Sequence, residues 1–192
     1  EKESRTKIIL IKSIKKKIVC GLMAKTKNIN LQIVTTLAGI NYAKKINTKY
    51  ILKTRTDQRF YCKESIQYFK NLYNQKFLEY DKIIVSSLNT FYTRLFSISD
   101  MFQFGKTETI FKFWNINLID RIKEKDIITI NKLLLIPEIY LIYIYLKNSL
   151  YDFKWTQGSY ESALVKYFYI VDKESIDLLW NKYNTLENNR NI

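Results

Sequence analysis

The chain has 192 residues, a net charge of +14 and 47% hydrophobic residues, an ordinary composition for one globular domain. This composition excludes disorder of the whole chain, collagen-like repeats and coiled coil. Because the chain has two cysteines and no histidine, it cannot form a Cys/His zinc site or use a Ser-His-Asp or Cys-His nucleophile. Any catalysis must therefore use carboxylates, Tyr, Lys or a metal held by carboxylates.

The positive charge does not by itself predict a nucleic-acid-binding protein. Only six of the 32 basic residues are Arg, the side chain best suited to bidentate phosphate and base contacts. We therefore expect no specific nucleic-acid partner. Residues 1–27 hold nine Lys and Arg against two Glu. Such a segment is attracted to an anionic membrane surface, although a solvated basic end explains the pattern equally well.

In chain order, the sequence alternates between helical and extended patterns. Residues 28–44 carry apolar side chains at helical spacing, and residues 49–54 predict a short strand. A second helix is predicted over 64–79, a buried strand over 82–88 and a short aromatic strand over 100–105. This alternation predicts an α/β layered domain with a mainly parallel sheet.

The second half of the chain has the signals of helices. Thr107 is expected to cap a helix over 107–114, because its hydroxyl can accept from the exposed amides of the first turn. The apolar run over 133–146 is too short to cross a membrane and predicts a buried helix. We expect the chain from there to about residue 186 to be mostly helical.

The chain has no segment typical of a linker. With four Gly and one Pro, it shows no domain boundary, and we expect a single domain over residues 1–192. It begins at Glu1 without an initiator Met, so we expect it to be a piece of a longer protein.

The segment YILKTRTDQRF at residues 50–60 has the clearest chemical pattern. An apolar strand leads into a short turn with four charged side chains, Lys53, Arg55, Asp57 and Arg59. Basic side chains suit phosphate oxygens and Asp57 suits a divalent cation, which together predict a diphosphate site. Sugar transfer from a nucleotide-sugar needs such a site, because the departing diphosphate gains negative charge. The alternative is a solvated turn with surface ion pairs.

Five segments then follow one another along the chain: NINLQIVTTLAGINYA at 28–43, YILKTRTDQRFY at 50–61, KIIVSSLNTF at 82–91, FSISDMFQFG at 96–105 and PEIYL at 137–141. Together they resemble the WavE-type lipopolysaccharide-synthesis proteins, bacterial glycosyltransferases similar to the metal-dependent, single-Rossmann-like fold (GT-A-like). The resemblance covers roughly residues 28–146. It implies a nucleotide-sugar-dependent enzyme. We expect this enzyme to be cytoplasmic, because two cysteines fit a reducing compartment, or peripheral on the inner membrane face through its basic end.

The resemblance implies a role for Asp57 as the counterpart of the acidic motif that binds metal and diphosphate, with Mn²⁺ or Mg²⁺ as cofactor. Transferases of this fold usually carry two Asp in that motif, whereas Arg55 occupies the first position here. We therefore expect Arg55 to neutralise part of the phosphate charge. The nucleotide-binding strand would lie in residues 1–27, which we expect to be degenerate or truncated, and residues 147–192 are expected to form a helical end.

The resemblance also places Ser99 and Asp100 near the donor sugar or the acceptor. Asp100 is a candidate base for the acceptor proton, with a turn cap as the alternative. Glu138 is the second candidate base, although a Glu in the first helical turn after a Pro is also what ordinary capping gives. Asn30 and Gln32, near the start of the first predicted helix, are candidates for contacts with phosphate or ribose.

We therefore expect a glycosyltransferase that moves a sugar from a nucleotide-sugar donor to a glycan or lipid-linked acceptor in lipopolysaccharide or capsule synthesis. The alternatives are an inactive or incomplete transferase, and a basic module that binds polyanions or a membrane surface. Such a module predicts steeply salt-dependent binding that is indifferent to Asp57→Ala, whereas a transferase predicts loss of nucleotide binding.

Overall fold

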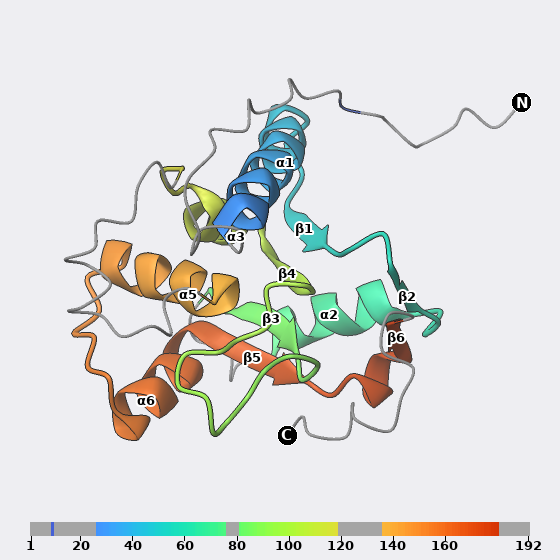
Figure 1. Ribbon diagram of the computed structural model, residues 1–192. Helices are drawn as coiled ribbons and strands as arrows, with labels where there is room; N and C mark the ends of the chain where they lie inside the picture. The colour runs from blue at the N-terminus through green and yellow to red at the C-terminus, as the bar shows by residue number, and fades with distance from the viewer. Residues whose placement is uncertain (1–8, 10–25, 76–80, 119–135, 181–192) are drawn as a thin grey trace, which may run out of the picture.

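The computed structural model describes residue 9 and residues 26–75, 81–118 and 136–180, which form a mixed α/β fold (Figure 1). The elements in chain order are α1 (Thr26–Lys45), β1 (Tyr50–Lys53), β2 (Gln58–Phe60), α2 (Ser65–Asn74), β3 (Ile83–Ser86), β4 (Gln103–Lys106), α3 (Thr107–Trp114), α5 (Pro137–Asn148), α6 (Gln157–Tyr167), β5 (Phe168–Val171), the 3₁₀ helix η3 (Glu174–Ile176) and β6 (Leu178–Trp180). The nucleotide-binding strand expected in residues 1–27 lies almost wholly outside the described residues. None of the described helices is long and apolar enough to cross a membrane.

Four strands form the main sheet in the order β1-β4-β3-β5. The pairs β1–β4 and β3–β4 are antiparallel, and the pair β3–β5 is parallel. The prediction of a mainly parallel sheet is therefore wrong, and the sheet is mixed. The reason lies in the connections: residues 87–102 lead from β3 to β4 without a helix, whereas β5 reaches β3 only after three described helices. A parallel pair requires such a long crossover.

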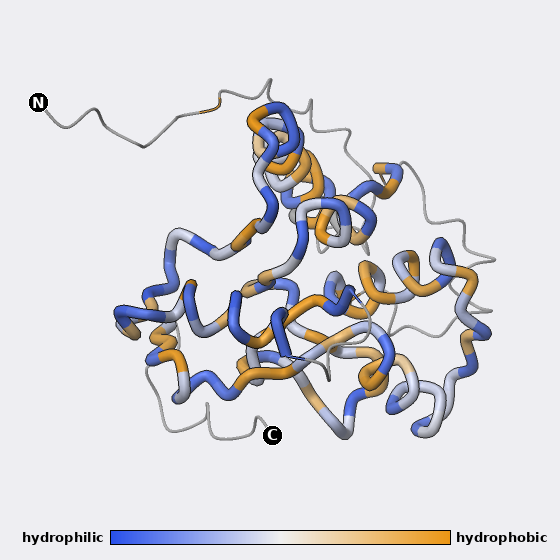
Figure 2. Tube along the Cα trace, turned by 180° about the vertical axis from the view of Figure 1, so that it is seen from behind, coloured by the Kyte–Doolittle hydropathy of each residue, from blue (hydrophilic) through white to orange (hydrophobic). Residues whose placement is uncertain are grey.

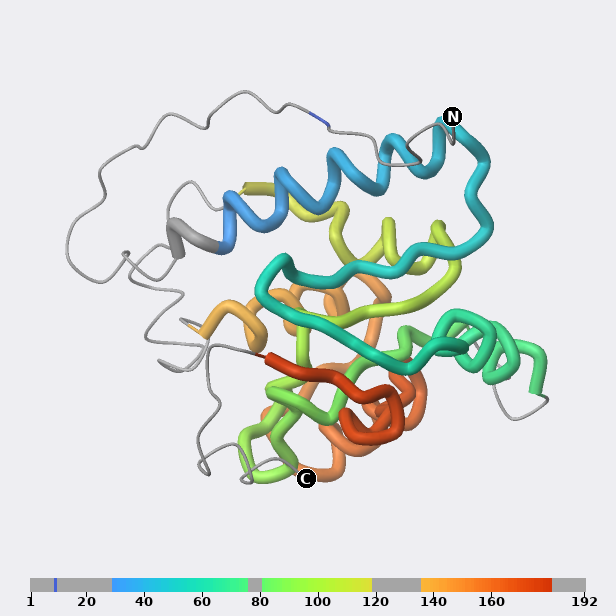
Figure 3. The backbone as a smooth tube through the Cα atoms, turned by 90° about the vertical axis from the view of Figure 1, so that its right-hand side faces the viewer, coloured from blue at the N-terminus to red at the C-terminus, as the bar shows by residue number. Residues whose placement is uncertain are grey.

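A second sheet pairs β2 with β6 in antiparallel register, with Gln58 opposite Trp180. Figure 3 shows the red end of the described chain lying beside the segment that follows β1. The prediction of a mostly helical C-terminal third is therefore only partly correct, because α5 and α6 are accompanied by β5 and β6. The sequence FYIV of β5 is aromatic and β-branched, which favours a strand.

The main sheet separates two apolar clusters. Successive residues of β3 point to opposite faces, so that Ile83 and Val85 join one cluster and Ile84 joins the other. The first cluster includes residues of α1, α3, α5 and α6, and the second includes α2, η3 and β6. Figure 2 shows hydrophobic residues, in orange, along the central strands. The core therefore positions the end of β1 and the start of β4, where the candidate site lies.

Several local predictions are confirmed. The helix predicted over 28–44 is α1, and the strands predicted over 49–54 and 82–88 are β1 and β3. The aromatic strand predicted over 100–105 is β4, which begins three residues later, at Gln103. The buried helix predicted over 133–146 is α5 from Pro137 on, and its first residues lie outside the described ones.

The predicted cap of α3 is wrong. Lys106 occupies the capping position, and Thr107 is the first residue of the helix. The hydroxyl of Thr107 donates instead to the backbone carbonyl of Thr48, which precedes β1. Thr107 therefore joins α3 to the start of β1.

Candidate functional site

Three of the predicted site residues meet beyond the end of β1. Gln32 of α1 donates from Nε2 to Oδ2 of Asp100, and Lys53, the last residue of β1, donates from Nζ to the backbone carbonyl of Asp100. Asp100 is 4% exposed and lies in the loop before β4. A helix, a strand and a loop that are distant in the sequence are thus held around one buried acidic residue.

The ammonium group of Lys53 is shielded from solvent. It is 5.1 Å from the centroid of the Trp114 ring, and the indole of Trp114 donates to Oε1 of Gln103 at 2.7 Å. Burial lowers the pKa of Lys53, and the charge of Arg55 lowers it further, while Asp100 opposes these effects. The desolvated ammonium gains most from a ligand that brings negative charge.

Glu138 stands near the same group of charges, in the first turn of α5. Burial raises the pKa of Glu138, and the negative charge of Asp100 raises it further, whereas Arg94 and Arg55 lower it. The two carboxyl groups and the cations of Lys53 and Arg55 therefore influence one another electrostatically. A carboxylate whose pKa is raised in this way is a stronger base than an ordinary Glu.

Arg55 and Asp57 form a bidentate ion pair in the turn after β1. Arg55 Nε lies 2.8 Å from Asp57 Oδ1 and Nη2 lies 2.9 Å from Oδ2, while the indole of Trp180 donates to Oδ2 at 3.0 Å. The hydrogen bond from Arg55 holds the pKa of Asp57 well below its ordinary range, and the bond from Trp180 acts in the same direction. Asp57 therefore holds the guanidinium of Arg55 in a fixed orientation.

The arrangement around Asp57 does not fit a metal ligand. Both of its carboxylate oxygens accept hydrogen bonds, and the neighbouring guanidinium of Arg55 repels a divalent cation. Within residues 26–75, 81–118 and 136–180, no three Asp, Glu, Cys or His side chains gather closely enough to hold a metal ion. The expected Mn²⁺ or Mg²⁺ stays a prediction.

The remaining predicted residues are placed apart from the group around Asp100. Arg59 is exposed in β2, and its Nη1 donates to the carbonyls of Thr56 and Gln58, both at 2.8 Å. Asn30 lies two residues before Gln32 in α1, a spacing that places the two side chains on different faces of a helix. Arg59 therefore stabilises the turn that precedes it. Asn30 lies on a different face of α1 from Gln32.

Ser99 lies inside the loop that precedes β4. It is fully buried, and its backbone amide donates to Oγ1 of Thr90 at 3.1 Å. Thr90 in turn donates from its hydroxyl to the carbonyl of Ser86 at the end of β3. Ser99 therefore helps to anchor the loop that carries Asp100.

Sequence reasoning missed two tryptophans that shape the site. Trp180 is 123 residues from Asp57 in the sequence. Trp114 is the last residue of α3, a helix for which the sequence indicated a cap at Thr107 but no role in the site. Neither had a local sequence signal, because each reaches its polar neighbour only through the packing of elements that are not adjacent along the chain.

The comparisons with known proteins give one family. The family model described as WavE lipopolysaccharide synthesis matches residues 20–133. This range includes α1, Lys53 at the end of β1, Asp57 in the turn that follows, and Asp100 in the loop before β4. The comparisons with curated proteins and with solved structures give no match. Since the matched range spans more than half of the chain, the protein belongs to the WavE lipopolysaccharide synthesis family.

Proposed function

We propose that the protein is a nucleotide-sugar-dependent glycosyltransferase that acts in lipopolysaccharide synthesis. The observation that carries this proposal is the grouping of two cations, Lys53 and Arg55, with two carboxyl groups, Asp100 and Glu138, beyond the end of β1. Glycosyl transfer needs both kinds of group, because it releases an anionic diphosphate and takes a proton from the acceptor.

The donor half of the site consists of Lys53 and Arg55. Burial removes water from the ammonium of Lys53. A diphosphate that binds beside it replaces the lost hydration with an attraction between opposite charges. The guanidinium of Arg55 is already oriented by Asp57, and its planar fork suits phosphate oxygens. We expect Asp57→Ala to weaken nucleotide binding, because Arg55 then loses its orientation.

The acceptor half consists of Glu138 and Asp100. When the acceptor oxygen attacks the anomeric carbon, the bond to the diphosphate breaks and the hydroxyl proton must pass to a base. Glu138 is the better base, since its pKa is raised and its carboxylate is not fixed by a bond from Gln32. Asp100, which Gln32 holds in place, orients the sugar hydroxyls.

Further features belong to the same proposal. They are a donor bound through its diphosphate, a glycan or lipid-linked acceptor, a single Rossmann-like transferase domain, and a cytoplasmic location at the inner membrane face. The family membership supports the role in lipopolysaccharide synthesis, and the charges around Lys53 support the diphosphate.

The experiment that tests this proposal measures release of nucleoside diphosphate from uridine- and guanosine-diphosphate sugars, with lipopolysaccharide added as acceptor. We expect turnover by the wild type and a loss of about 10²–10⁴-fold in Glu138→Gln. The matched control is Glu174→Gln, which changes an exposed residue of η3 and should keep wild-type turnover. Equal turnover in Glu138→Gln and wild type would remove Glu138 from the mechanism.

A further inference from the structure

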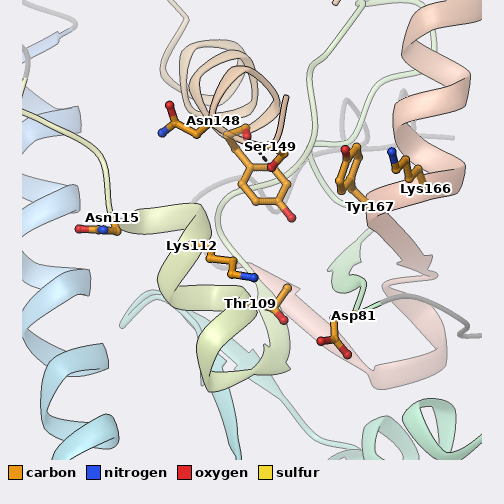
Figure 4. Close-up of a pocket in the computed structure, with 9 residues that line it drawn as sticks. Asp81, Thr109, Lys112, Asn115, Asn148, Ser149, Lys166 and Tyr167 are labelled. Atoms are coloured by element: carbon orange, nitrogen blue, oxygen red, sulfur yellow. Dashed lines mark hydrogen bonds between the residues drawn. The ribbon is translucent and has the colours of Figure 1, made fainter. Parts of the chain in front are cut away.

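The structure has a cavity that none of the candidate site residues lines. This cavity of about 540 Å³ is lined by residues of α3, of the end of α5 and of the junction between α6 and β5 (Figure 4). This volume is typical of cavities that take small ligands.

The cavity lies at the end of the sheet opposite to the candidate site. Lys53 ends β1, and β4 runs antiparallel to β1, so that Lys106 lies beside the start of β1 and α3 begins there. The cavity is bordered by Asp81, which precedes β3, and by Lys166, which precedes β5. None of the residues assigned to sugar transfer lines it.

The charges of this cavity favour an anion. Lys112 of α3 and Lys166 of α6 both line it, and neither has an acidic partner among the residues that the structure describes. Asp81, the acidic residue of the lining, is ion-paired with Lys106, which stands outside the cavity. Two cations therefore remain to attract a negatively charged ligand.

The uncharged lining suits sugar hydroxyls. Asn115 and Asn148 border the cavity with exposed side chains, and no side-chain hydrogen bond joins them to other described residues. An amide donates and accepts at once, as do neighbouring hydroxyls of a sugar. Figure 4 shows Lys112 extending from α3 toward the space that Tyr167 borders. The ring of Tyr167 adds an apolar surface beside these polar groups.

We propose that this cavity binds a short anionic saccharide. Its carboxylate or phosphate groups meet Lys112 and Lys166, and its hydroxyls exchange hydrogen bonds with Asn115 and Asn148. The inference stands apart from the proposed sugar transfer, because it uses other residues at the other end of the sheet.

The test titrates the full chain with trigalacturonic acid, glucose 6-phosphate, maltotriose and inorganic phosphate. We expect one or both of the anionic sugars to bind at least tenfold more tightly than neutral maltotriose and than phosphate alone. The double variant Lys112→Gln/Lys166→Gln should weaken that binding at least tenfold, and Asn115→Ala/Asn148→Ala should weaken it several-fold. The matched control Lys63→Gln/Lys70→Gln removes the same charge from exposed positions away from the cavity and should bind as the wild type does.

Three results would overturn the proposal. They are no binding of either anionic sugar at millimolar concentration, equal weakening in the control variant, and binding of inorganic phosphate as tight as that of the sugars. Titration of the same variants with nucleoside diphosphates serves as a second readout. Lys112→Gln/Lys166→Gln should leave nucleotide affinity unchanged, so a failure here is distinct from a failure of the proposed sugar transfer.

Discussion

Asp57 and Glu138 are both carboxyl groups, and their surroundings move their pKa values in opposite directions. The guanidinium of Arg55 lowers the pKa of Asp57, whereas burial raises the pKa of Glu138. Groups whose environments separate their pKa values in this way take different roles in a site. Asp57 remains ionised and orients Arg55, while Glu138 is suited to take up a proton.

Glu138→Gln should change the pH dependence of stability. Because the folded protein raises the pKa of Glu138 above its ordinary value of 4.5, the group favours folding most at low pH. That contribution is lost as the pH rises from about 4.5 through the raised pKa. We therefore expect the wild type to lose more stability than Glu138→Gln between pH 4 and 8. Thermal unfolding across this range measures the difference, and parallel pH curves would contradict it.

Asp57→Asn should have the opposite pH signature. The pKa of Asp57 is lowered in the folded state, so its contribution is fully present above its ordinary value of 3.8 and is lost as the pH falls from there through the lowered pKa. The side chains of Arg55 and Asp57 are 39% and 34% exposed, and solvent weakens their attraction. We expect a loss of about 0.2–1 kcal/mol at pH 7 that disappears on acidification. Urea unfolding at pH 7 and pH 2 measures it, and a loss of the same size at both pH values would refute the ion-pair account.

At the scale of elements, β4 packs so closely against its neighbours that it leaves little room for a larger side chain at Gly105. A Cβ atom at Gly105 would stand 3.1 Å from Cδ1 of Ile110 and 3.1 Å from the hydroxyl of Tyr73. Gly39 of α1 offers the contrast, because a Cβ atom there meets nothing within 4 Å. The packing around Gly105 therefore leaves little room for a side chain, whereas the surroundings of Gly39 leave space for one.

Gly105→Ala should destabilise the protein by about 1–3 kcal/mol, because Ile110 and Tyr73 must move to admit the methyl group. Gly39→Ala is the matched control and should stabilise the protein by about 0.4–1 kcal/mol, since it only restricts the unfolded chain. Urea unfolding of both variants measures the two effects. Similar changes in both would show that β4 packs less closely than described.

Local periodicity predicted most of the helices and the strands β1, β3 and β4, but it predicted neither the strands β2, β5 and β6 nor the pairing of the strands. The apolar spacing of α1 and the β-branched run of β3 were sufficient signals, because they depend only on neighbouring residues. The antiparallel direction of β4 depends on a connection without a helix, which no local pattern reveals. The candidate site follows the same rule. The charged turn after β1 could be predicted from neighbouring residues, whereas the hydrogen bond from Gln32 to Asp100 could not, because it joins residues 68 positions apart.

At the scale of the whole molecule, β6 connects the end of the described chain to the candidate site. It pairs with β2, and its Trp180 donates to Asp57, so the orientation of Arg55 depends on a strand far along the sequence. The cavity at α3 is lined by none of the residues assigned to sugar transfer. The two sites can therefore be altered independently.

Trp180→Phe tests this connection, because it keeps an aromatic ring and removes the N–H that donates to Asp57. We expect a loss of about 0.5–1.5 kcal/mol in unfolding free energy and a higher pKa for Asp57. Urea unfolding and carboxyl titration by NMR measure the two effects. An unchanged Asp57 pKa would show that the indole does not reach the carboxylate in solution.

The most direct test of the account is a calorimetric titration with uridine, guanosine and cytidine diphosphates, each with and without Mn²⁺. We predict that one nucleotide binds the wild type, that Lys53→Gln weakens its binding at least tenfold, and that Lys63→Gln, which changes an exposed lysine, leaves it unchanged. Equal weakening in both variants, together with a steep dependence on salt, would instead indicate a binder of polyanions. That result, or no binding of any nucleotide, would contradict the proposed diphosphate site.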